Sequence, residues 1–155
     1  MQKTFYEIKV RCLNEKEAED VLKPLNLGAP KISHVTGTYL KSDSPNTEKI
    51  YEVDDEVFYT VVESTPSGFL MTKKGITQAE KEDHLKKREI DKIMRKERRI
   101  WMVGELEVAT DTVEGLEGIF IEVSGPREES LKSFFLKLGI NESRFLTKPY
   151  NKFLQ

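Results

Sequence analysis

The fold is decided by the stretch Asp111-Thr-Val-Glu-Gly-Leu-Glu-Gly-Ile-Phe-Ile-Glu-Val-Ser-Gly125. Gly115 and Gly118 bracket a turn, and the branched and aromatic residues that follow predict a strand from about Ile119 to Val123. Glu122 lies on the face opposite the three alternating branched residues of this strand. A buried carboxylate needs a cation or a metal to compensate its charge. Either this face lines a charged interior, or the sheet is half solvated and Glu122 is exposed to water.

A second strand with charged residues on one face is predicted near the N-terminus. Residues 4–13 alternate, so that Glu7, Lys9 and Arg11 share one face and apolar residues occupy the other. By itself this pattern is typical of an ordinary half-buried strand. Beside the 111–125 stretch, the charged face becomes a candidate interior wall.

The remaining segments alternate between strands and helices. A β-hairpin is predicted over residues 57–74, because Thr65-Pro-Ser-Gly68 forms a tight connection between two β-rich runs. The charged segment 78–97 has an acidic start and a basic end, which favours a solvated helix. Other predicted strands cover 31–40, 50–53, 98–102 and 105–110, and other predicted helices cover 14–25 and 128–138.

Composition restricts the classes of function. The 155 residues include 25 basic and 27 acidic side chains, which give a net charge of −2. This balance provides no general attraction to nucleic acid or to an anionic membrane, so any anion site must be formed locally. Cys12 is the only cysteine, which excludes an internal disulfide and suits a reducing compartment. No apolar run reaches the length of a membrane span and no signal-peptide pattern is present, so we expect a soluble cytoplasmic protein.

Four segments of the chain resemble the motifs of one known superfamily, in the expected order. Glu7-Ile8-Lys9 resembles the second half of an N-terminal Glu-x-Glu-x-Lys motif, and Thr72-Lys73-Lys74-Gly75 resembles a Thr-x-Lys-Gly strand end. Residues 111–122 resemble the acidic signature Asp-x-Val-Glu-Gly-Leu-x-Gly-x-Phe-x-Glu, and residues 148–154 resemble a closing Ser-Tyr-x-x-Leu-Leu segment. Together they resemble the CYTH superfamily, which comprises class IV adenylyl cyclases, thiamine triphosphatases and related triphosphate tunnel enzymes.

The resemblance implies an α+β fold in which residues 1–155 form a single CYTH-like domain. An antiparallel eight-stranded β-barrel would be open as a tunnel and flanked by helices. Basic side chains would bind the phosphates of a nucleotide or another organic triphosphate, and carboxylates would hold Mg²⁺ or Mn²⁺. Carried over by position, the phosphate-binding catalytic residues are Lys9, Arg11, Lys74 and Arg98 or Arg99, and the metal ligands are Glu7, Asp111 and Glu122.

The sequence departs from the motifs in three places, and these departures lead to two functional hypotheses. Phe5 and Ser124 replace two acidic positions, and the hairpin segment from Tyr59 to Glu63 lacks the expected arginines. One hypothesis is a metal-dependent phosphohydrolase or adenylyl cyclase. The other is a catalytically degenerate protein that binds a nucleotide or cyclic nucleotide, as a sensor or a sink. Two further possibilities stay open, namely a barrel that binds no ligand and association of the chain into a homodimer.

Overall fold

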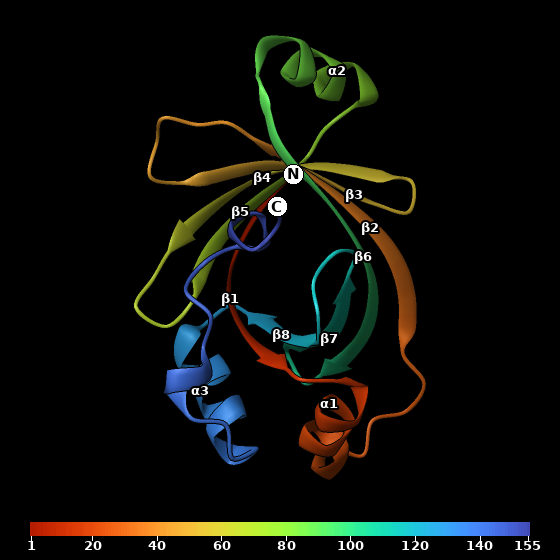
Figure 1. Cartoon of the computed structure of the whole chain (residues 1–155), viewed down its shortest axis with the longest axis vertical. Helices are drawn as coiled ribbons and strands as arrows, with labels where there is room; N and C mark the ends of the chain where they lie inside the picture. The colour runs from red at the N-terminus through yellow and green to blue at the C-terminus, as the bar shows by residue number, and fades with distance from the viewer.

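Eight antiparallel strands close into a barrel in the computed structural model, which describes all residues 1–155 (Figure 1). Around the barrel the strands follow the order β1-β5-β4-β3-β2-β6-β7-β8. The predicted α+β class and eight-stranded barrel are therefore confirmed. The strands are β1 Gln2–Cys12, β2 Lys31–Leu40, β3 Thr47–Val53, β4 Glu56–Ser64, β5 Phe69–Gly75, β6 Ile90–Val103, β7 Leu106–Val113 and β8 Ile119–Gly125.

Three helices flank the barrel. They are α1 Glu15–Leu22, α2 Gln78–Lys87 and α3 Glu128–Lys137, accompanied by short 3-10 segments at Lys23–Leu25, Glu142–Arg144 and Tyr150–Lys152. Helices α1 and α3 lie at one end of the molecule and α2 lies at the other (Figure 1). The predicted cap of α1 is present, because the Asn14 side chain accepts a hydrogen bond from the Glu17 amide at 2.9 Å. None of these helices has the length and apolar character needed to cross a membrane.

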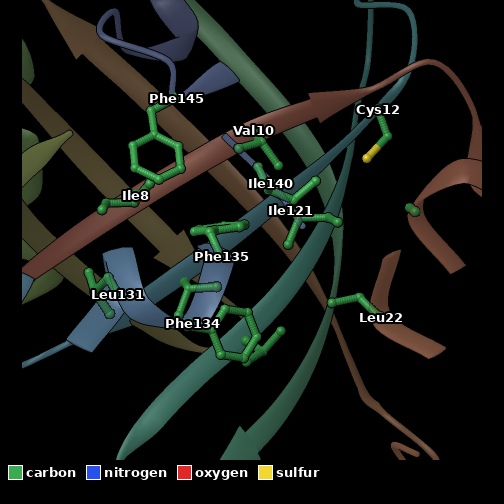
Figure 2. Close-up of a cluster of buried hydrophobic side chains, with 13 residues drawn as sticks. Ile8, Val10, Cys12, Leu22, Ile121, Leu131, Phe134, Phe135, Ile140 and Phe145 are labelled. Carbon is green, nitrogen blue, oxygen red and sulfur yellow. The ribbon is translucent and has the colours of Figure 1, made fainter. Parts of the chain in front are cut away.

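The largest apolar cluster lies outside the barrel wall. Residues of β1 and β8 pack there against α3 and α1, as Figure 2 shows for Ile8, Ile121 and Phe135. Ile8, Val10 and Ile121 are fully buried although they point away from the lumen. Burial of apolar surface stabilises the wall from its outer side, so the inner side can carry charged groups beside a smaller apolar cluster.

Strand register sets the opposite face of β1 inside the barrel. Lys9 lies directly across from Glu122 on β8, and Glu7 lies across from Ser124 on β8 and Phe69 on β5. Because the barrel is closed, strands have no free edge and alternate side chains must enter the lumen. The charged face predicted for residues 4–13 is therefore an interior wall at Glu7 and Lys9, whereas Arg11 is exposed.

The predicted helix over 78–97 is wrong in its second half. Helix α2 ends at Lys87, and β6 begins at Ile90 and continues to Val103. On β6 the residues Met94, Lys96 and Arg98 are buried, whereas Ile93 and Arg95 are exposed. Both faces of this strand carry cations, so the period-2 alternation of burial has no matching alternation of hydrophobicity. The charge gradient that favoured a long helix belongs to a helix and a strand in succession.

Candidate functional site

Charged side chains from several strands meet in the barrel lumen. They include five of the eight predicted site residues, which are at most 9% exposed. Arg98 is the arginine of the 98–99 pair that faces inward. The buried charged groups of the lumen are Glu7, Lys9, Lys49, Lys96, Arg98, Asp111 and Glu122.

Asp111 is the centre of a fully buried ion network. Arg98 donates to both of its carboxylate oxygens, at 2.8 and 2.9 Å, and Lys96 donates to Oδ2 at 2.9 Å. The hydroxyl of Tyr150, from the C-terminal 3-10 segment, donates to the same oxygen at 2.8 Å. Arg98 also donates to Glu122 Oε2 at 2.6 Å. The cations Lys96 and Arg98 are thus neutralised by carboxylates of β7 and β8.

Glu7 and Glu122 occupy neighbouring positions but differ in protonation. Burial and the negative charge of Glu122 together raise the pKa of Glu7 to about 7, although Lys9 lies 3.4 Å away. Burial also opposes ionisation of Glu122, but the charges of Arg98 and Lys96 outweigh it and hold the pKa of Glu122 well below its usual range. Near pH 7, Glu7 therefore exchanges between its protonated and ionised forms, whereas Glu122 stays ionised.

Lys49 and Lys73 enter the lumen without a carboxylate partner. The ammonium group of Lys49 lies 5.0 Å from the centroid of the Tyr51 ring, and that of Lys73 lies 5.2 Å from the same centroid. Burial, together with repulsion from Lys96, lowers the pKa of Lys49 to about 7. Burial likewise lowers the pKa of Lys73. The lumen therefore contains two cationic groups whose charge no acid compensates by direct contact.

Thr60 lies between these two lysines. In the strand register it is directly opposite Lys49 of β3 on one side and Lys73 of β5 on the other. The residue is 2% exposed, and its hydroxyl has no hydrogen-bond partner. A buried hydroxyl without a partner is uncommon, and it points to a ligand or an ordered water. All three side chains line a lumen cavity of about 40 Å³.

The C-terminal segment fills much of the remaining lumen. The Tyr150 ring makes an edge contact with Phe120 at 4.9 Å, and the ammonium of Lys9 lies 3.8 Å from its centroid. Both rings belong to an apolar cluster inside the barrel that also includes Val35, Tyr39, Tyr51, Met94 and Val113. The space left for a ligand is consequently small, and its lining includes Lys49, Thr60 and Lys73 together with the acids Glu7, Glu107 and Glu122.

Three predicted site residues lie elsewhere. Lys74 is exposed on the outer face of β5, and its neighbour Lys73 occupies the lumen position. The guanidinium of Arg11 donates to the Glu117 carbonyl at 2.9 Å and is exposed. Arg99 points outward and forms an ion pair with Glu15 at 3.3 Å. The structure does not bring these three into the lumen.

The lumen residues that the motifs missed carry weak sequence signals. Lys73 follows Met71 by two positions and shares its face, so strict alternation along 69–74 identifies it in place of Lys74. Lys49 is assigned by the same rule from Tyr51, once the strand is extended to its true start at Thr47. Lys96 had no such signal, because its segment was predicted to be a helix. Thr60 lies in the hairpin segment from Tyr59 to Glu63 that lacks the expected arginines, and a threonine in a strand gives no functional signal.

The predicted metal ligands do not form a preformed cation site. Both oxygens of Asp111 accept hydrogen bonds from Lys96, Arg98 and Tyr150. No group of three or more carboxylate, histidine or cysteine side chains is arranged to hold a metal ion. Mg²⁺ requires near-octahedral oxygen ligands, which an acid already surrounded by cations does not supply. The residues present therefore fit Mg²⁺ or Mn²⁺ poorly.

Comparisons with known proteins rest on structure alone. No family model matches the sequence, and no curated protein matches it significantly. A Pyrococcus horikoshii protein whose name states no activity is similar with a TM-score of 0.80 and 18% identity, covering 97% of this chain and 99% of that chain. A candidate adenylate cyclase from Bacillus halodurans has a TM-score of 0.66 and 16% identity, covering 96% and 94% of the two chains.

A plant protein extends the comparison. An adenylyl cyclase candidate from Hippeastrum, whose name reports a dominant triphosphatase activity, has a TM-score of 0.60 and 12% identity over 99% of this chain and 93% of that one. Identities this low establish a shared fold only. Together with the closed eight-stranded barrel, they support the resemblance of the sequence motifs. This chain therefore has the same fold as these proteins, a closed eight-stranded barrel, which is the fold that the resemblance to the CYTH superfamily implies.

Proposed function

We propose that the barrel binds the phosphate group of a nucleotide or another organic phosphate in its lumen, as a binding protein without metal-dependent turnover. The observation that carries this proposal is the row formed by Lys49, Thr60 and Lys73. Two ammonium groups without acid partners flank a buried hydroxyl without a hydrogen-bond partner. Phosphate oxygens accept hydrogen bonds from both kinds of donor, and charge-assisted hydrogen bonds are the stronger ones.

The ion network favours binding over catalysis. A metal-dependent phosphohydrolase or cyclase needs carboxylates that are free to hold the cation. Here Asp111 and Glu122 are engaged with Arg98. The names of the structural neighbours support a phosphate-containing ligand as the chemical class.

Isothermal titration calorimetry with AMP and ATP, each with EDTA and then with Mn²⁺, tests the proposal. Binding is expected without metal. Lys73→Met is expected to weaken it about 10-fold or more, because a charged hydrogen bond contributes roughly 1.5–3 kcal/mol. Lys74→Met is the matched control, since it removes the adjacent lysine from the outer face of β5, and it should leave the affinity unchanged.

Two results would contradict the proposal. One is the absence of heat with every phosphate compound. The other is Mn²⁺-dependent release of phosphate, or formation of a cyclic nucleotide, that is lost in Glu122→Gln, because turnover of that kind assigns the lumen acids to metal catalysis.

A further inference from the structure

The geometry points to a ligand that presents a single phosphoryl group, as a phosphate monoester does, and not a diphosphate or triphosphate chain. This inference rests on the proposed function and narrows it. It is carried by three properties of the cavity, namely its free charge, its volume and the layout of its donors.

The free charge of the cavity matches one phosphoryl group. Lys96 and Arg98 are engaged with Asp111 and Glu122, and Lys9 lies 3.4 Å from Glu7, so the lumen cations without a carboxylate within 4 Å are Lys49 and Lys73. A phosphate monoester carries about −1.5 to −2 at neutral pH, close to the charge of two ammonium groups. Every further phosphoryl group adds negative charge for which no free cation is present. That charge would also lie close to Glu7, Glu107 and Glu122, which line the same cavity.

The volume leads to the same ligand. The cavity of about 40 Å³ is far below the roughly 300–1,000 Å³ of an ordinary ligand pocket, so it has room for one small anionic group. A second phosphoryl group inside the cavity would have to displace side chains that line it, such as Tyr51.

The donors are laid out as a compact set. Lys49, Thr60 and Lys73 stand side by side on β3, β4 and β5, where adjacent strands lie about 4.8 Å apart. The ammonium groups of Lys49 and Lys73 both approach the Tyr51 ring, at 5.0 and 5.2 Å from its centroid. Two ammonium groups and one hydroxyl provide a donor for each terminal oxygen.

An apolar surface of the protein lies beside Lys49, Thr60 and Lys73, where the organic part of the ligand would bind. Phe5 and Met71 face each other across β1 and β5 and line the same cavity. They form an apolar contact for the carbon that carries the ester oxygen.

A length series of phosphates tests the inference. Orthophosphate, pyrophosphate, tripolyphosphate, AMP and ATP are titrated into the whole protein in EDTA by calorimetry. Orthophosphate and AMP are expected to bind at least 10-fold more tightly than tripolyphosphate and ATP. Thr60→Val should weaken orthophosphate binding several-fold, whereas Thr60→Ser, which restores the hydroxyl, should retain it. Circular dichroism melts confirm that both variants fold.

The outcomes separate this inference from the proposed function. Equal or tighter binding of tripolyphosphate and ATP overturns the single-phosphoryl assignment and leaves phosphate binding intact. Unchanged affinity in Thr60→Val also overturns it, because the hydroxyl is then no ligand. Failure of all five compounds to bind overturns the proposed function itself.

Discussion

Asp111 shows how a single residue compensates the buried positive charges inside the barrel. Its carboxylate is 0% exposed and accepts hydrogen bonds from one arginine, one lysine and one tyrosine. Burying a charge is costly unless it is paired and hydrogen-bonded, and this site meets both conditions. The same residue therefore sets the charge state of its two cationic neighbours.

Removing this charge should be strongly destabilising. Asp111→Asn leaves Lys96 and Arg98 with Glu122 as their remaining acidic partner, so we expect the free energy of unfolding to fall by about 3–5 kcal/mol. Urea denaturation monitored by circular dichroism measures the change. Glu107→Gln, on the same strand but without a cation in contact, is the control and should cost less than about 1 kcal/mol. Equal losses in the two variants would show that the ion network is not what stabilises the lumen.

At the scale of elements, the tight approach of the turn before β8 to the end of β1 depends on Gly118. This residue has a φ of +87°, and a Cβ placed there would lie 2.3 Å from the Cys12 carbonyl oxygen. The backbone conformation is one that other residues adopt at a cost of roughly 1–2 kcal/mol. The steric clash with β1 adds to that cost. The turn before β8 is thus also a point of close contact with the end of β1.

Gly118→Ala should therefore destabilise the fold by about 2 kcal/mol or more, which corresponds to a fall in melting temperature of at least about 4 °C for a chain of this length. Gly28→Ala is the matched control, since nothing lies within 4 Å of a Cβ at that position. Thermal melts of both variants compare the two effects. A melting temperature of Gly118→Ala equal to that of Gly28→Ala would contradict the close contact.

The elements also show what sequence reasoning reaches and where it stops. Strands with apolar residues on one face, such as β1 and β2, were predicted within two residues of their true ends. Strand β6 was not, because cations occupy both of its faces and only the closed barrel distinguishes buried Lys96 from exposed Arg95. The same limit applies to the site. The motifs identified the acidic positions Asp111 and Glu122. The cations without an acid partner, Lys49 and Lys73, are found only from the pairing of the strands, which cannot be read from any single segment of the sequence.

At the scale of the whole molecule, the lumen acts as one electrostatic unit. Burial and repulsion from Lys96 lower the pKa of Lys49 to about 7, and the pKa of Glu7 is raised to a similar value. As the pH rises through this range, Lys49 loses positive charge and Glu7 gains negative charge. Both changes make the lumen less attractive to an anion. The charged groups that face Lys49 come from four strands and are Glu7, Lys9, Lys73, Lys96 and Glu122.

Anion affinity should therefore fall with rising pH. A bound anion stabilises protonated Lys49 and raises its pKa, so binding takes up protons above pH about 7 and the affinity decreases there by up to about 10-fold per pH unit. Sulfate is the suitable probe, because its own charge is constant across this range. Calorimetry at pH 6 and at pH 8.5 measures the change, and Lys49→Met should show a flatter profile. A sulfate affinity that does not vary with pH would contradict this coupling.

The position of the main apolar cluster, outside the wall and beneath α1 and α3 (Figure 2), has a practical consequence. Ile8, Val10 and Ile121 point away from the lumen. Substitutions at the lumen positions Lys49, Thr60 and Lys73 therefore leave the packing of this cluster unchanged. New specificities for small anions can be selected on an unaltered scaffold.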